Sequence, residues 1–272
     1  MAGKLDGKVA FITGAARGQG RSHAVRLGLE GADIIAVDVC RQIEGVPYPM
    51  ATAEDLDQTV KEVEALGRRI VARQADVRDE AGLRAAFDAG VAQLGPADIV
   101  VADAGVATMS LRETHEAWQV VIDVNFTGTF NTIEVALPAM IEQGRGGAIV
   151  LISSSAVLNG IGDPSRDGLA GTASEHGFVS LMRSYADNLA PHGIRVNSVH
   201  PTGARTPMAE NDALRELLTA DPRAGTAIAN ALPVDMVESA DITSAVAWLV
   251  SDDARYLTGI ALAVDAGFTN RG

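Results

Sequence analysis

The stretch VAFITGAARGQG, residues 9–20, decides the fold of this chain. Its apolar beginning predicts a buried strand, and the apolar positions of residues 21–30 predict a helix that packs on a sheet. Between them, glycine has no Cβ, so the backbone can turn sharply and approach an anion closely, and the free amides of the helix N-terminus face that anion. The order predicts a phosphate-binding unit, although the motif alone fits an ordinary strand-to-helix turn equally well. The residues expected to form the unit are Gly14, Arg17, Gly18, Gln19 and Gly20.

A carboxylate at the end of the next strand narrows the choice of anion. The apolar run of residues 33–37 ends in Asp38, eighteen residues after Gly20. A carboxylate at that distance is placed to accept both hydroxyls of an adenosine ribose and to repel a 2′-phosphate, which indicates NAD rather than NADP. Arg17 favours a phosphate weakly, or it lies in solvent.

Composition limits the classes of protein that remain. The 272 residues are 47% hydrophobic, which predicts one globular unit over residues 1–272. The formal charge of 22 − 35 = −13 argues against a nucleic-acid partner and against an anionic membrane surface. A single cysteine, Cys40, fits a reducing compartment, and no apolar stretch has the length of a membrane span or the form of a signal peptide. We therefore expect a cytoplasmic protein, and no motif predicts a metal site.

Strands and helices alternate along the rest of the chain. Further strands are predicted at about residues 70–75, 98–102, 148–152, 195–200 and 260–264, and helices at about 52–66, 79–94, 115–124, 126–140, 172–190 and 240–250. This alternation predicts an α/β protein with a seven-stranded parallel sheet flanked by helices on both faces, whose ligands lie beyond the carboxyl ends of the strands. Residues 159–169 are predicted to form a loop. The long segment at about 204–234, with a short helix at 213–220, is predicted to be a substrate lid.

Taken together, these motifs resemble the short-chain dehydrogenase/reductase family over essentially the whole chain, which implies a single Rossmann-type, doubly wound domain that binds NAD. The resemblance implies a serine that orients the substrate oxygen at Ser154 and a helix-bending, proton-relay asparagine at Asn125. It implies cofactor contacts at Asp38, Asp76, Val77, Asp103, Ala104, Gly105, Pro201, Gly203 and Thr206, with Asp103 standing where the family usually has asparagine.

The excursion from Val39 to Ala51 is similar to a subset of this family related to carveol dehydrogenases. That resemblance implies a tightly held NAD that is re-oxidised through the peptide-derived cofactor mycofactocin rather than exchanged. The family also implies a homotetramer in which the helices after Asn125 and Thr172 pack across an interface. A hetero-oligomer with an active relative is the alternative.

The catalytic pair departs from the family pattern. The family has a tyrosine, followed four residues later by a lysine, at the start of the helix where this chain has Gly171 and Glu175. Tyr185 lies ten residues past Glu175, about 15 Å along the helix, which is too far to substitute; we interpret it as a core aromatic. Glu175 either turns to solvent or accepts hydrogen bonds from the nicotinamide ribose, and the second case predicts a preference for NAD⁺ over NADH.

Two functions from different classes remain open. General acid–base catalysis typically contributes about 10²- to 10⁴-fold, and glycine has no proton to donate, so turnover should be weak or absent. One reading is an NAD-dependent oxidoreductase for a small, largely apolar alcohol or ketone, in which Asp163, Asp167 or His176 replaces the lost acid. The other is a catalytically silent NAD-binding protein, either a sensor or a structural partner of an active relative.

Overall fold

The computed structural model describes residues 3–111, 116–158, 166–220 and 229–270. Seven strands form one sheet in the order β3-β2-β1-β4-β5-β6-β7, and every neighbouring pair is parallel. The predicted sheet is therefore confirmed. The strands are β1 Val9–Thr13, β2 Asp33–Asp38, β3 Ile70–Gln74, β4 Ile99–Ala102, β5 Gly147–Ile152, β6 Ile194–Pro201 and β7 Ala261–Val264.

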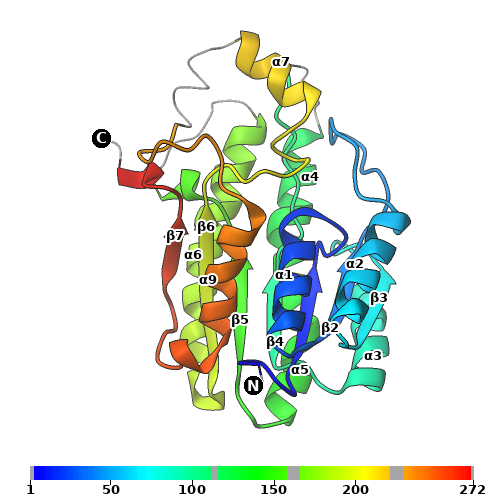
Figure 1. The fold of residues 1–272 in the computed structure, drawn as a ribbon. Coiled ribbons are helices and arrows are strands. Elements are labelled where there is room, and N and C mark those ends of the chain that lie inside the picture. Colours follow the sequence, from blue (N-terminus) through cyan, green and yellow to red (C-terminus); the bar gives the residue numbers. More distant parts are fainter. Residues whose placement is uncertain (1–2, 112–115, 159–165, 221–228, 271–272) are drawn as a thin grey trace.

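Helices cover both faces of the sheet (Figure 1). α1 packs against α2 and α9 on one face, while α3 packs against α5, and α4 against α6, on the other. The helices are α1 Gly18–Leu29, α2 Ala53–Ala65, α3 Glu80–Leu94, α4 Ala117–Val121, α5 Gly128–Glu142, α6 Arg166–Leu189, α7 Asp212–Ala220 and α9 Ser239–Val250. Within the described residues, no helix combines the length and the apolar character that crossing a membrane requires.

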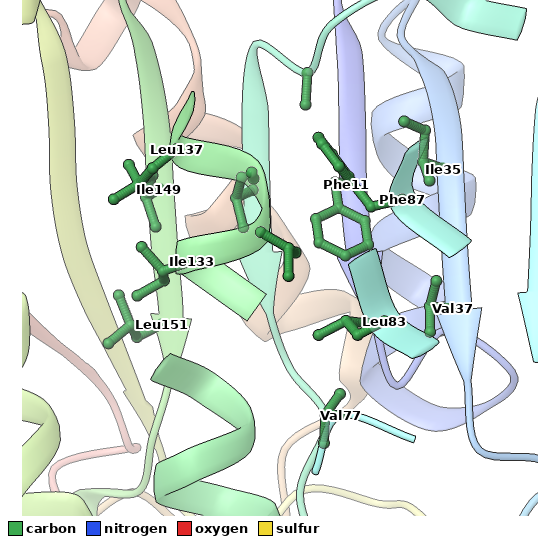
Figure 2. Close-up of a cluster of buried hydrophobic side chains, with 14 of the residues drawn as sticks. Phe11, Ile35, Val37, Val77, Leu83, Phe87, Ile133, Leu137, Ile149 and Leu151 are labelled. Carbon is green, nitrogen blue, oxygen red and sulfur yellow. The ribbon is translucent and has the colours of Figure 1, made fainter. Parts of the chain in front are cut away.

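The strand sequences explain why two cores form. Successive side chains of a strand point to opposite faces, so Phe11 and Ile35 join the core under α3, α5 and α6, whereas Ile12 and Ile34 join the core under α1, α2 and α9. Figure 2 shows the first of these cores, in which the Phe11 ring lies 4.9 Å from the Phe87 ring. A sheet buried on both faces needs apolar residues at nearly every strand position, which is the pattern that residues 9–12 and 33–37 carry.

Local hydrogen bonds fix the start of α2 as the sequence predicts. Thr52 Oγ1 accepts from the Asp55 backbone N–H at 3.2 Å, and the Asp55 carboxylate accepts from the Thr52 N–H at 2.9 Å. This reciprocal capping box satisfies two amide groups that a helix start leaves unpaired.

The helices expected at about 115–124 and 126–140 are α4 and α5, and the π-helical turn η1, Ile122–Thr127, joins them into one run. Asn125 lies inside that turn, between the two helices as predicted. One predicted boundary is wrong. The loop expected at 159–169 gives way to helix at Arg166. Glycine and aspartate disfavour a helix by only about 1 kcal/mol each, and packing that buries Ala170 completely outweighs that preference.

The order of the strands places the site. Connections leave β1 toward β2 and β4 toward β5, so the sheet reverses direction between β1 and β4. In sheets of this kind the crevice at the reversal, beyond the carboxyl ends of the strands, receives the ligand. Figure 1 shows α7 and the excursion of residues 39–51 at that end of the sheet.

Candidate functional site

The glycine loop packs too closely to admit side chains. Gly14 and Gly18 have φ angles of +73° and +57°, which glycine adopts without strain. A Cβ on Gly20 would lie 2.0 Å from the Gly14 carbonyl oxygen, and a Cβ on Gly14 would lie 3.0 Å from the Ala104 backbone. The first turn of α1 therefore lies directly against Gly14, which itself packs on the turn after β4, and the free amides of that first turn are available to an anion.

Asp38 lies against this loop. Its carboxylate accepts from the Ala16 N–H at 3.0 Å and from the Cys40 N–H at 3.1 Å, and the residue is 8% exposed. These two bonds fix the carboxylate at the crevice while leaving it acceptor capacity. Arg17 is not free in solvent, because its guanidinium donates to the Pro49 carbonyl oxygen at 2.6 Å and so links the loop to the excursion. The Oε1 atom of Gln19 is buried and has no hydrogen-bond partner among the described residues.

The residues after β3 are held by arginines and by α5. Asp76 accepts hydrogen bonds from Arg78 and Arg41, including one of 2.6 Å from Arg78 Nη2 and one of 3.0 Å from Arg41 Nη2. Burial alone would raise the pKa of Asp76, but these bonds outweigh it and lower the pKa to about 2. The Val77 carbonyl accepts from Asn131 Nδ2 at 2.8 Å. The segment is thus rigid and carries a carboxylate at neutral pH.

The turn after β4 connects the glycine loop to Asn125. The Ala104 N–H donates to Thr13 Oγ1 at 3.4 Å, and a Cβ on Gly105 would lie 3.6 Å from Asn125 Oδ1. The Asp103 side chain is buried, with its Oδ1 atom 3.8 Å from His23 Nε2 on α1. Asp103 therefore turns its carboxyl into the protein rather than into the crevice.

Asn125 is held by the backbone of a single residue. Its Nδ2 donates to the Val106 carbonyl at 3.0 Å, and its Oδ1 accepts from the Val106 N–H at 2.9 Å. The π-helical turn that carries Asn125 widens the helix at this point, a feature common at functional sites. Asn125 thus fixes the start of the chain segment that follows the β4 turn.

Ser154 follows β5 and keeps a hydroxyl proton to donate. Its Oγ accepts from the Ala156 N–H at 3.2 Å, and its carbonyl lies 3.0 Å from His200 Nδ1. Because a carbonyl only accepts, Nδ1 carries the hydrogen, and the neutral ring then accepts from Ser198 Oγ through Nε2 at 2.8 Å. Burial lowers the pKa of His200, which favours this neutral form. His200 was missed at the sequence level, although its place next to Pro201 could have indicated it.

Replacing His200 by leucine is expected to lower the free energy of unfolding by about 1–3 kcal/mol, because the Ser154 carbonyl and the Ser198 hydroxyl both lose their partner. Asparagine at the same position keeps an N–H near the place of Nδ1, so it should lower the free energy of unfolding by less than leucine does. Chemical unfolding of both variants measures the difference. Equal losses in the two variants would show that the bond to Ser154 does not matter.

The N-terminal half of α6 carries Gly171 and Glu175, the two residues that depart from the family pattern. A Cβ on Gly171 would have no described atom within 4 Å, and Glu175 is half-buried. His176 is exposed, and its Nδ1 donates to the Thr172 carbonyl at 2.9 Å, so it faces solvent as a poor candidate for the lost acid. Asp163 lies outside the described residues, and so does the Asp167 side chain.

Tyr185, farther along α6, forms a hydrogen bond to α5 instead of contributing to the site. Its hydroxyl donates to Glu134 Oε1 on α5 at 2.5 Å, and its half-buried ring packs against the core. Burial and the Glu134 carboxylate raise the pKa of Tyr185. The interpretation of Tyr185 as a packed aromatic is confirmed.

The segment after β6 reaches the glycine loop. Pro201 ends β6, the Gly203 carbonyl accepts from the Val237 N–H at 3.0 Å, and the Thr206 methyl would lie 3.3 Å from a Cβ on Gly18. Gly18 and Thr206, far apart in the sequence, therefore lie side by side. The predicted lid includes residues 221–228, which lie outside the described residues.

One protein family matches most of this chain. Residues 8–217 match the family described as short chain dehydrogenase. The chain belongs to the short-chain dehydrogenases. The match begins just before β1 and ends within α7, so it includes the glycine loop, Asn125, Ser154 and the segment after β6.

Relatives of this short-chain dehydrogenase extend the likeness over the full chain. A protein of Mycobacterium tuberculosis described as an oxidoreductase is 58% identical over 268 residues, which cover 98% of each chain. (−)-trans-Carveol dehydrogenase of Rhodococcus erythropolis is 47% identical over 98% of this chain and 99% of its own. The crystal structure of carveol dehydrogenase from Mycobacterium avium in complex with NAD is similar with a TM-score of 0.92 and 45% identity, covering 99% of this chain and 100% of that one.

Proposed function

We propose that this short-chain dehydrogenase binds NAD and acts as an oxidoreductase on a small, largely apolar alcohol or ketone, with weak turnover. The observation that carries the proposal is the contrast between two parts of one crevice. The glycine loop and the Asp38 carboxylate are assembled as a nucleotide site requires, whereas the helix position expected to supply the catalytic acid is Gly171, which has no side chain.

The cofactor assignment rests on residues that fit a dinucleotide. A diphosphate would meet the amides at the start of α1, and the ribose hydroxyls would donate to Asp38. Two further observations support NAD: the solved carveol dehydrogenase from Mycobacterium avium is an NAD complex, and the buried Oε1 of Gln19, unpartnered within the described chain, marks acceptor capacity beside the loop. When bound, NAD⁺ supplies the hydride acceptor of the reaction.

NAD⁺ is expected to bind at least about tenfold more tightly than NADP⁺, because the buried Asp38 carboxylate would face the extra phosphate. Calorimetric titration of both nucleotides measures the difference, and Asp38→Asn, which removes the charge and keeps the shape, should narrow it. Equal affinities in the unmodified protein would contradict the assignment to NAD.

The rim of the crevice indicates the class of substrate. Large apolar side chains are exposed on segments that follow β4, β5 and β6, at the end of the sheet where the ligand is expected; they are Met109, Leu111, Leu158, Leu169, Leu232 and Val234. Exposed apolar groups gathered from several segments are characteristic of a site that takes an apolar ligand. A small hydrophobic alcohol or ketone fits this rim better than a charged metabolite does.

The protein's own part in the reaction is positioning. The Ser154 hydroxyl, whose oxygen already accepts from Ala156, has its proton left to donate to the substrate oxygen. Asn125 and His200 hold the two segments that carry the site. Positioning accelerates a reaction, but it leaves the proton of an alcohol without an acceptor at Gly171. The Glu175 carboxylate beside the nicotinamide would favour NAD⁺ over NADH, which calorimetry with both forms tests.

The second candidate is a catalytically silent NAD-binding protein, a sensor or a structural partner of an active relative, and Gly171 is the observation that favours it. Purified protein incubated with NAD⁺, a panel of secondary alcohols and an artificial electron acceptor separates the two. The acceptor covers the case in which NAD is held and re-oxidised in place, as the resemblance to the carveol dehydrogenase subset implies. Turnover that Ser154→Ala abolishes supports the oxidoreductase. Nucleotide binding without turnover supports the silent protein.

A homotetramer, or a hetero-oligomer with an active relative, is part of the proposal. Phe130 on α5 is 42% exposed, and the bond between Tyr185 and Glu134 fixes α5 against α6. A rigid pair of helices with an exposed aromatic is suited to pack against a second copy. Analytical ultracentrifugation, with Phe130→Lys as the disrupting variant, tests the assembly.

A further inference from the structure

A buried histidine lies beneath the glycine loop, outside the residues that the proposed reaction uses. His23 on α1 is 0% exposed, and its Nδ1 lies 2.8 Å from the hydroxyl of Thr243 on α9. That hydroxyl also bonds Ser22 Oγ at 2.8 Å. The other ring nitrogen, Nε2, has no hydrogen-bond partner among the described residues and points to Asp103 Oδ1, 3.8 Å away. A nitrogen left unpaired in the interior is costly, so its orientation toward a carboxyl requires an explanation.

The groups around the Asp103 carboxyl act on its pKa in opposite directions. Burial raises the pKa of its carboxyl, His23 opposes that rise, and the carboxylate of Asp38 adds to it. The charged groups nearby come from three elements: His23 from α1, Asp38 from β2 and Asp103 from β4; α9 contributes only the Thr243 hydroxyl. Arg17 and Arg21 do not neutralise the pair, since Arg17 bonds Pro49 and Arg21 bonds the Ala16 and Asp55 carbonyls.

His23 and Asp103 lie close to the glycine loop, so a change in the charge of this pair would alter the electrostatic potential at a bound nucleotide. The Asp103–Ala104 backbone touches Gly14, because a Cβ on Gly14 would lie 3.0 Å from Ala104 and 3.2 Å from the Asp103 carbonyl carbon. Gly14 begins the loop that receives the diphosphate. A bare Asp103 carboxylate would repel that anion, as would Asp38, whereas a pair of Asp103 and His23 that holds one proton has no net charge and would not.

We propose that His23 is a positioning residue for the nicotinamide nucleotide: one proton, held by the pair of its imidazole and the Asp103 carboxyl, draws the Asp103–Ala104 turn against Gly14, and the nucleotide binds together with that proton. This inference rests on the proposed binding of NAD and adds a role for two residues that the catalytic machinery leaves unused. The anionic diphosphate strengthens the hold of the pair on the proton, and by reciprocity the proton strengthens the hold on the nucleotide.

The sign of the pH dependence follows from this reciprocity. At a pH where the His23–Asp103 pair of the free protein has lost its proton, nucleotide binding requires that the pair takes up a proton again. The affinity for NAD⁺ therefore falls as pH rises. A single linked proton changes the dissociation constant by at most about tenfold per pH unit. The change begins above the ordinary range of an aspartic acid, because the raised pKa of Asp103 extends proton binding upward.

Calorimetric titration of the full chain with NAD⁺ tests the proposal in buffers of different ionisation enthalpy, from about pH 6 to about pH 9. The heats should show net uptake of up to one proton per nucleotide. Asp103→Asn keeps the shape of the side chain and removes its charge, so uptake should vanish and the pH profile of the affinity should flatten. Thr243→Val is the matched control: it removes a buried hydrogen bond to the same ring but neither titrating group, so uptake should persist.

Each outcome of the calorimetric test either supports the inference or overturns it. Nucleotide binding with no proton uptake in the unmodified protein, or uptake that Asp103→Asn leaves unchanged, overturns the inference alone. Loss of uptake in Thr243→Val to the same extent as in Asp103→Asn shows a purely structural role and also overturns it. A protein that binds no NAD⁺ overturns both this inference and the proposed function. If Asp103→Asn does not fold, His23→Gln, which cannot hold the shared proton, is measured in its place with the same expectation.

Discussion

The double substitution Gly171→Tyr with Glu175→Lys is expected to raise the rate of secondary-alcohol oxidation by at least about 10²-fold, the contribution typical of a general acid or base. The position admits a Cβ, because no described atom outside its own helix backbone lies within 4 Å of one on Gly171. The lysine would replace a carboxylate with a cation, which lowers the pKa of a neighbouring phenol. Formation of NADH, followed by its absorbance, is the measurement.

A matched variant separates chemistry from packing in this experiment. Gly171→Phe with Glu175→Lys adds the same ring and the same cation without the hydroxyl, so its activity should stay at the level of the unmodified protein. If the phenylalanine variant gains as much as the tyrosine variant, the added surface and not the proton accounts for the gain. If neither gains while both still bind NAD⁺, the crevice is not a disarmed catalytic site.

Gly20→Ala is expected to weaken NAD⁺ binding by at least about 10²-fold and to lower the free energy of unfolding by about 2–3 kcal/mol. The new Cβ would lie 2.0 Å from the Gly14 carbonyl oxygen and 2.6 Å from its carbon, so either the loop or the first turn of α1 must move. Movement there displaces the amides that receive the diphosphate. Calorimetric titration and chemical unfolding measure the two effects.

Gly171→Ala is the control for that experiment, since it adds the same methyl group to a helix where nothing described lies within 4 Å. Its affinity for NAD⁺ should be unchanged, and its stability should rise by about 0.5–1 kcal/mol because alanine favours a helix interior over glycine. Equal losses of affinity at Gly20 and Gly171 would contradict the close packing of the glycine loop.

Much of the site could be predicted because its residues follow strand ends. Asp38, Asp76, Asp103 and Ser154 each lie at the carboxyl end of a strand or within two residues of it, and parallel strands bring such positions to one edge of the sheet. The structure confirms that edge. The sequence could not predict which partner each side chain takes. Arg17 donates a hydrogen bond to Pro49, and Asn125 accepts one from Val106, because the folded chain brings these distant residues together.

The error has the same origin. Glycine and aspartate made residues 166–169 resemble a loop, since propensity acts locally and weakly. The two helices predicted around Asn125 are present, but the turn between them is itself helical. In the folded protein, burial of Ala170 and of residues along both sides of Asn125 carries the helices through these positions. Local preference decided the start of α2, where Thr52 and Asp55 cap the helix without help from elsewhere.

By itself, then, the sequence determined the parallel sheet, the glycine loop, the carboxylate at Asp38 and the absence of a side chain at Gly171, because periodicity, backbone freedom and residue identity are properties of the chain alone. Only the tertiary structure decided that His200 holds Ser154 and that His23 faces Asp103. Those pairs are separated by 46 and 80 residues along the chain, as 200 − 154 and 103 − 23 give. No local pattern encodes such contacts, which arise when β5 lies beside β6 and α1 packs over the end of β4, and it is burial in that packing that gives them their effect.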